Sequence, residues 1–169
     1  MSADAPWSRL VRLSEAQRGA VVTLDASDAE RAGVARLLDL VALRRLTGEV
    51  VLKPWLDGAE IHGRFHADFT RTCGVSLEPF EQTQTGDFTL RVVPAGSPHA
   101  PTAEEEIDID APDPPDVLEG DQIDLAAYLV EYFALELDPF PRAPDVEFVQ
   151  PPEPAEPSPF AGLAALKRN

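Results

Sequence analysis

Residues 46–69, LTGEVVLKPWLDGAEIHGRFHADF, decide the fold class, because apolar and polar side chains alternate on both sides of one turn signal. The apolar positions are Val50, Leu52, Leu56, Ile61, Phe65, Ala67 and Phe69. A period of two is typical of half-buried strands, and Asp-Gly is the favoured two-residue hairpin turn because both residues tolerate a positive φ. The stretch therefore predicts a β-hairpin that turns at Asp57-Gly58, with Leu52 opposite Gly63 and one apolar face.

Further strands and a first helix are predicted on both sides of this hairpin. The strand-like runs are Trp7 to Leu13, Val21 to Leu24 and Phe88 to Val92, the last antiparallel to the second hairpin arm. A capping box at Ser27 and Glu30 begins a helix. We extend this helix to Arg45, so that Arg44 and Arg45 meet its C-terminal dipole. Its expected apolar stripe is Val34, Leu37, Leu38 and Val41.

A second helix is predicted from a cap at Asp121 or Asp124 to about Leu137. The side chains expected on its wettest face are Asp124, Tyr128, Glu131 and Asp138. The predicted fold class is therefore α+β: an antiparallel β-sheet with two packed helices, a long acidic loop and a tethered C-terminal peptide.

The charge of the chain is concentrated in its second half. The 169 residues carry a net charge of -16, but residues 1–99 hold 11 basic and 13 acidic side chains, whereas residues 100–169 hold 3 and 17. Fourteen of the 17 prolines lie from Pro94 onward. We therefore predict a single domain over 1–148 with an acidic, proline-rich loop at 94–121. A proline-rich linker at 149–157 and a short amphipathic peptide at 158–169 complete the prediction.

Several classes of protein do not fit the sequence. No apolar run approaches the roughly 20 residues of a membrane-spanning helix, and the stretch from Met1 to Trp7 lacks the features of a secretory signal. A single cysteine permits no internal disulfide. We expect a cytoplasmic protein that does not associate with membranes.

The residues that could carry chemistry form no convincing site. His62 and His66 share one strand face but should lie roughly 13 Å apart, too far for one metal ion. Cys73 has no neighbouring base and fits a half-buried structural cysteine. The acidic run at 104–110 lacks the spacing of a calcium loop. We predict that the protein is not an enzyme and uses no cofactor or metal.

Three stretches resemble one family. TCGVSLEPF at 72–80, ALELDPFPRAP at 134–144 and SPFAGLAALK at 158–167 resemble the YceD family of large ribosomal RNA subunit accumulation proteins, in its alphaproteobacterial form. Many members carry C-x-x-C-L at the strand end. Here Cys73 matches the first cysteine and Ser76 occupies the second position, which argues against a shared thiol-based metal or redox role.

The resemblance implies a non-enzymatic factor in ribosome biogenesis that supports accumulation of the large-subunit ribosomal RNA. The family-motif residues that become candidates for protein binding are Cys73, Leu77, Glu78, Pro79, Asp138, Pro139, Pro141, Arg142, Pro159, Phe160, Leu163 and Leu166. The terminal peptide has two open interpretations, docking on its own fold or on a partner.

Three functional hypotheses follow, and they differ in the partner. An acidic chain suits a basic ribosomal protein or a large-subunit precursor, for which it would be an adaptor or chaperone. The alternative is direct rRNA binding through arginines of the first half, with Arg44, Arg45, Arg64 and Arg71 as candidates. The third is a small enzyme of unknown reaction, which would need a deep pocket with convergent polar groups.

Overall fold

The computed structural model describes residues 5–101, 113–148 and 150. Its elements, in chain order, are β1 (Leu10–Arg12), α1 (Leu13–Ala16), β2 (Ala20–Asp25), α2 (Asp28–Leu37), β3 (Ala42–Trp55), β4 (Gly58–Thr72), β5 (Pro79–Pro94), β6 (Asp116–Leu118), β7 (Gln122–Asp124) and α3 (Leu125–Leu135). This content confirms the predicted α+β class. The predicted peptide at 158–169 and most of the predicted linker lie outside the described residues.

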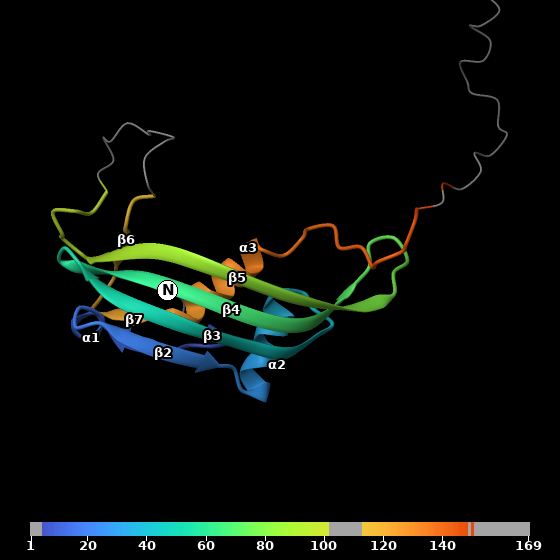
Figure 1. Cartoon of the computed structure of the whole chain (residues 1–169), viewed down its shortest axis with the longest axis horizontal. Helices are drawn as coiled ribbons and strands as arrows, with labels where there is room; N and C mark the ends of the chain where they lie inside the picture. The colour runs from blue at the N-terminus through green and yellow to red at the C-terminus, as the bar shows by residue number, and fades with distance from the viewer. Residues whose placement is uncertain (1–4, 102–112, 149, 151–169) are drawn as a thin grey trace, which may run out of the picture.

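Three long strands form the centre of the molecule. A five-stranded sheet has the order β2-β3-β4-β5-β6, antiparallel except for the parallel pairing of β6 with β5. Figure 1 shows α2 and α3 behind this sheet, with its other face toward the viewer. A second ladder pairs β1 with β7. Within the described residues, the core therefore lies on one side of the sheet, and the strand β6 falls inside the stretch predicted as a loop.

The hairpin forms as predicted, but its register differs by two residues. Trp55 pairs with Gly58 and Leu52 pairs with Ile61, so the turn residues are Leu56 and Asp57. The predicted turn at Asp57-Gly58 is therefore wrong. A shift of two keeps the paired side chains on their predicted faces, so Val50, Leu52, Ile61 and Phe65 are buried as predicted. Leu56, predicted on the apolar face, lies in the turn and is exposed.

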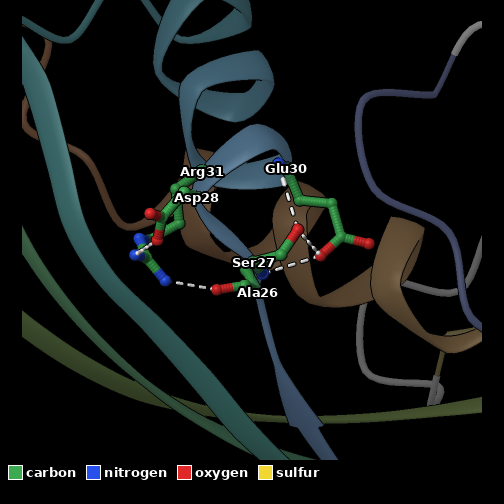
Figure 2. Close-up of polar contacts among 5 residues, drawn as sticks. All are labelled: Ala26, Ser27, Asp28, Glu30 and Arg31. Carbon is green, nitrogen blue, oxygen red and sulfur yellow. Dashed lines mark hydrogen bonds and ion pairs between the residues drawn. The ribbon is translucent and has the colours of Figure 1, made fainter.

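Helix α2 begins as predicted. The Ser27 backbone N–H donates to the Glu30 carboxylate at 2.7 Å, and the Ser27 hydroxyl accepts from the Glu30 N–H at 3.5 Å. Figure 2 shows these contacts, with Arg31 bound to Asp28 and to the Ala26 carbonyl. Hydrogen bonds from Ser27 lower the pKa of Glu30. The capping box is confirmed.

Helix α2 ends earlier than predicted. The Leu40 N–H donates to the Ala35 carbonyl at 2.9 Å, and Asp39 takes a positive φ of 53°. These are the features of a Schellman cap, in which glycine is the usual left-handed residue. Because aspartate stands there instead, the sequence contains no glycine stop signal. The predicted stripe is wrong at Leu37 and Val41, which are exposed, whereas Val34 is fully buried and Leu38 packs partly buried against the core.

Arg44 and Arg45 lie in β3 and not at a helix end, so their predicted position is wrong. A β-bulge between Leu43 and Arg45 inserts one extra residue into the strand. The bulge keeps Leu43 and Leu46 on the buried face although they are three residues apart. Both arginines are exposed beside it.

Helix α3 has the predicted Asp124 cap in an unpredicted environment. The Asp124 carboxylate accepts from the Ala127 N–H at 3.2 Å, the Arg9 N–H at 2.8 Å and the Ser8 hydroxyl at 2.6 Å. Asp124 is buried, so its placement on the wettest face is wrong. It joins the N-terminal segment to the helix, which a local sequence pattern cannot reveal.

The buried face of α3 packs on β3 and β4. Its buried residues are Leu125, Ala126, Leu129, Val130 and Phe133. Phe133 packs edge to face against Phe65 and Phe69, with ring centroids 5.7 and 5.4 Å apart. Leu129 lies over Gly48, where a Cβ would come within 2.2 Å of its Cδ1. The helix can therefore lie close to the sheet, because Gly48 of β3 has no side chain at the point of contact.

Candidate functional site

Residues 73–78 form a tight turn between β4 and β5, which we call the Cys73 turn. The Cys73 N–H donates to the Glu78 carbonyl at 2.9 Å, directly beyond the last strand pair, and the Leu77 N–H donates to the Cys73 carbonyl at 2.9 Å. Leu77 adopts a positive φ of 61°. The TCGVSLEPF motif at 72–80 therefore contains a closed, hydrogen-bonded turn.

The second motif lies directly against this turn. The Gly74 N–H donates to the Pro141 carbonyl at 2.8 Å, and the Arg71 guanidinium donates to the Asp138 carbonyl at 2.7 Å. Figure 1 shows the chain after α3 running to the turn at this end of the sheet. We call the Cys73 turn together with residues 138–143 the motif junction. It unites two stretches that are about 65 residues apart in the sequence.

Cys73 lies inside the motif junction and binds both of its parts. Its side chain is buried, and its sulfur accepts from the N–H groups of Ala143 at 3.3 Å, Val75 at 3.4 Å and Ser76 at 3.5 Å. These bonds, with the Ala143 contribution largest, lower the pKa of the thiol to about 6, against a smaller opposing effect of burial. The sequence suggested no such setting, because the strongest donor comes from the other motif.

The Cys73 contacts predict a pH-dependent contribution to stability. The folded pKa is depressed, so the contribution should be absent below about pH 6 and grow as pH rises toward the ordinary thiol pKa of about 8.5. Urea unfolding of the wild type and of Cys73→Ser at pH 5.5, 7 and 8.5 should show a stability difference that widens with pH. Native thiolate absorbance at 240 nm should titrate near pH 6, and a pH-independent difference would contradict this account.

The motif junction exposes two large apolar side chains. Leu77 is 75% exposed and Phe140 is 77% exposed. Leu77 also occupies the left-handed region, which costs a non-glycine residue roughly 1–2 kcal/mol. An exposed leucine in a strained conformation brings no gain to the isolated fold. Leu56 in the β3–β4 turn shares both features, so Leu77 is distinguished by its place in the motif junction, which also exposes Phe140.

The remaining predicted motif residues are placed as follows. Glu78 and Arg142 are exposed, Pro79 begins β5, and Pro139 is exposed beside Asp138. The Asp138 carboxylate accepts from the Phe140 N–H at 2.8 Å, which fixes the segment before Pro141. Pro159, Phe160, Leu163 and Leu166 lie outside the described residues.

The four arginines proposed for RNA contact are not gathered at one place. Arg44 pairs with Glu81, and Arg64 lies 3.8 Å from Glu49, both on the water-facing side of the sheet. Arg45 lies opposite Asp68 on that side. Arg71 instead binds the motif junction. Their role in RNA contact stays a prediction.

The water-facing side of the sheet is polar. It contains a hollow of about 530 Å³ whose lining includes Thr23, Thr47, Glu49, Arg64, His66 and Asp87. The His66 imidazole contacts the Asp68 carboxylate at 3.2 Å. The Thr83 hydroxyl also donates to the Asp68 carboxylate, and not to the His66 imidazole. His62 contacts a different carboxylate, that of Glu60. Among the described residues there is no cluster of three or more metal-ligating side chains.

Comparison with known proteins matches the two motifs to one family. The family model described as "Large ribosomal RNA subunit accumulation protein YceD" matches residues 61–167, which contain the whole motif junction. The chain belongs to the YceD family. The match also covers the region of the terminal motif, whereas the alphaproteobacterial form of the family stays a prediction. No curated protein and no solved structure matches the chain.

The description of the YceD family concerns the accumulation of large-subunit ribosomal RNA. In this member, the Ser76 N–H bonds to the Cys73 sulfur at 3.5 Å, and the Ser76 hydroxyl accepts from Glu78 at 3.3 Å. Serine at this position therefore takes part in the hydrogen bonding of the turn. In the described part of the chain, no helix is long and apolar enough to cross a membrane.

Proposed function

We propose that this YceD protein is a non-enzymatic cytoplasmic adaptor that binds a basic ribosomal protein during assembly of the large subunit. The observation that carries the proposal is Leu77, an exposed apolar residue held in a strained conformation within the family motif. Binding of a partner would bury this side chain together with Phe140. Full burial of one such side chain is worth about 1.5–3 kcal/mol.

The charges around the two apolar side chains favour a basic partner. Glu78, Asp138, Asp145 and Glu147 are exposed in or near the motif junction, and Arg142 is the exposed cation among them. Residues 100–169 as a whole carry 3 basic and 17 acidic side chains. Ribosomal proteins that bind rRNA are basic, so attraction to them is long-range and weakens with salt. RNA phosphates would be repelled by the same charges.

Affinity capture from cells tests this proposal directly. The tagged full chain should retain large-subunit proteins at about 50 mM salt and lose most of them at about 500 mM, as expected for electrostatic association. Ribonuclease treatment before capture separates protein partners from partners held through RNA. Absence of large-subunit proteins at low salt would contradict the proposal, and binding of purified rRNA fragments that depends on Arg44 and Arg64 would favour the alternative of direct RNA contact.

Substitution of Leu77 should separate partner binding from stability. Leu77→Gly removes the strained side chain, so the free energy of unfolding should rise by about 0.5–1 kcal/mol. Capture of the large-subunit protein should fall about tenfold or more, because roughly 1.4 kcal/mol of apolar burial is lost. Urea unfolding and quantitative capture measure the two effects.

Leu56 provides a matched control at the opposite end of the sheet. It is also a leucine with a positive φ, 49°, and is 61% exposed in the β3–β4 turn. Leu56→Gly should give the same gain in stability and leave capture unchanged. Equal loss of capture in both variants would show that the Cys73 turn has no special role.

A further inference from the structure

Strand β5 has a long open edge. Its partner β6 pairs only with Val92, Val93 and Pro94, whereas β4 pairs with β5 from Pro79 to Val92. In the described residues, no strand pairs with the outer edge of β5 between Pro79 and Arg91. Alternate backbone N–H and C=O groups of an edge strand point outward without partners.

The middle of this edge, residues 83–88, is the part best suited to another strand. The motif junction lies at the start of β5, and residues 113–116 approach β5 at Thr89 to Arg91. Six residues of strand span about 20 Å, which matches the usual length of strands in globular proteins. Figure 1 shows β5 as the outermost long strand, with the end of α3 emerging behind it. We call residues 83–88 the open edge.

The open edge lies among carboxylates. The Cγ of Glu136 is 3.6 Å from the point where a side chain at Gly86 would begin, and Asp87 is exposed on β5. At one end of the open edge lies a hollow of about 440 Å³ whose lining includes Thr89, Arg91, Asp113, Asp116, Tyr128 and Glu131. Arg91, the one cation in this lining, is bound to Glu60 at 3.1 Å. The charge offered to a partner is therefore negative.

From the open edge and its carboxylates, we infer that β5 receives an extended basic peptide segment of a partner protein by β-strand addition. Backbone hydrogen bonds to the edge would supply affinity, and lysines or arginines of the segment would pair with Glu131, Glu136 and Asp87. Open edges normally risk pairing between copies of a chain. Here the net charge of -16 repels a second copy and admits a basic strand.

This inference rests on the proposed function, since it names the form in which a basic ribosomal protein is held. It adds a second contact surface to the motif junction, and the two surfaces lie along the same strand: β5 begins directly after the Cys73 turn. A partner with a basic tail could therefore contact Leu77 with its folded part and the open edge with its tail.

The test uses the full chain and two synthetic peptides. The first is an acetylated, amidated octapeptide of alternating lysine and valine, and the second is the same peptide with N-methyl groups on all internal amides. Both carry the same charge, but only the first has donors on its internal amides. We expect the first to bind at least tenfold more tightly at low salt and to slow exchange of those amides in residues 83–88 that point away from β4.

Charge-reversal variants locate the binding site. Glu131→Lys with Glu136→Lys should weaken the first peptide at least tenfold, whereas Glu15→Lys with Asp25→Lys, on α1 and β2, should leave its affinity unchanged. Both double variants change the net charge equally and alter exposed residues, so only their position differs. Circular dichroism confirms that each variant is folded.

Three results would overturn the inference. The first is equal binding of both peptides, and the second is protection of amides elsewhere than residues 83–88. The third is protection, already in the free chain, of the amides of residues 83–88 that point away from β4, which would show that a segment of this chain occupies the edge. Failure of the inference and of the proposed function are distinguishable. If the peptides fail but large-subunit proteins are still captured in a Leu77-dependent manner, the adaptor proposal stands without strand addition.

Discussion

Phe133→Ala should lower the free energy of unfolding by about 3–5 kcal/mol, the range measured for removal of a buried phenylalanine. Phe133 is fully buried, and its ring contacts Phe65 and Phe69 edge to face at 5.7 and 5.4 Å. Each aromatic pair adds about 0.5–1.5 kcal/mol beyond its buried area. A domain of this kind has about 5–15 kcal/mol in total, so one substitution removes a large share.

The control for this prediction lies two residues further along the same helix. Leu135 is 73% exposed, so Leu135→Ala should change stability by less than about 0.5 kcal/mol. Urea unfolding followed by far-UV circular dichroism measures both variants. Similar effects of the two substitutions would mean that α3 does not pack on the sheet through Phe133.

Phe133 should also affect the proposed binding of a partner, because it fixes the position of α3. The helix that it anchors carries Glu131, which lies at one end of the open edge, and ends at Glu136 beside Gly86. The chain after the helix brings Asp138 to the motif junction. A loosened α3 should therefore weaken capture of the basic partner even under conditions in which most of the protein remains folded. The core and the proposed binding surfaces are coupled by this one helix.

Much of the fold could be predicted because its signals are local. The alternation through residues 46–69 indicates two strands and their buried face, and the capping box of Ser27 and Glu30 indicates the start of α2. A shift of register by two leaves the faces unchanged. Local periodicity and capping chemistry therefore identify the elements and their buried faces.

The errors have two physical causes: a local cap without its usual glycine, and contact between distant parts of the chain. Asp39 stands in the cap that ends α2, where glycine is usual. The bulge beside Arg44 adds one residue to β3, so the spacing of its buried side chains resembles that of a helix. Asp124 is buried because Ser8 and Arg9 donate to it from the other end of the chain. None of these environments is visible in the residues next to the position concerned.

The candidate site shows the same division. The family motifs around Cys73 and Asp138 could be quoted from the sequence, but their union in one structure could not. The decisive bonds, from Gly74 to Pro141 and from Ala143 to Cys73, cross about 70 residues of chain. The strain at Leu77 and the open edge of β5 depend on backbone geometry and strand order, which composition does not encode.

Gly58→Ala should be the second most damaging substitution, with a loss of about 3 kcal/mol or more in the free energy of unfolding. A Cβ at residue 58 would lie 1.9 Å from the Val92 carbonyl oxygen and 3.1 Å from the Val93 Cα, both backbone atoms of β5. Backbone cannot move aside as a flexible side chain can, so the variant must separate β4 from β5 at this end. Overpacking alone commonly costs 1–3 kcal/mol, and the lost strand pairing adds to it.

This expectation explains the error in the hairpin register. Gly58 resembles the second residue of an Asp-Gly turn, but it serves the close approach of β5, while Leu56 takes the positive φ of the turn. Gly120→Ala is the matched control, because a Cβ there has no atom within 4 Å and should change stability by less than about 0.5 kcal/mol. Urea unfolding of both variants measures the difference. If the Gly58→Ala protein were as stable as the Gly120→Ala protein, β5 would not pass so close to residue 58, and Gly58 would serve the turn instead.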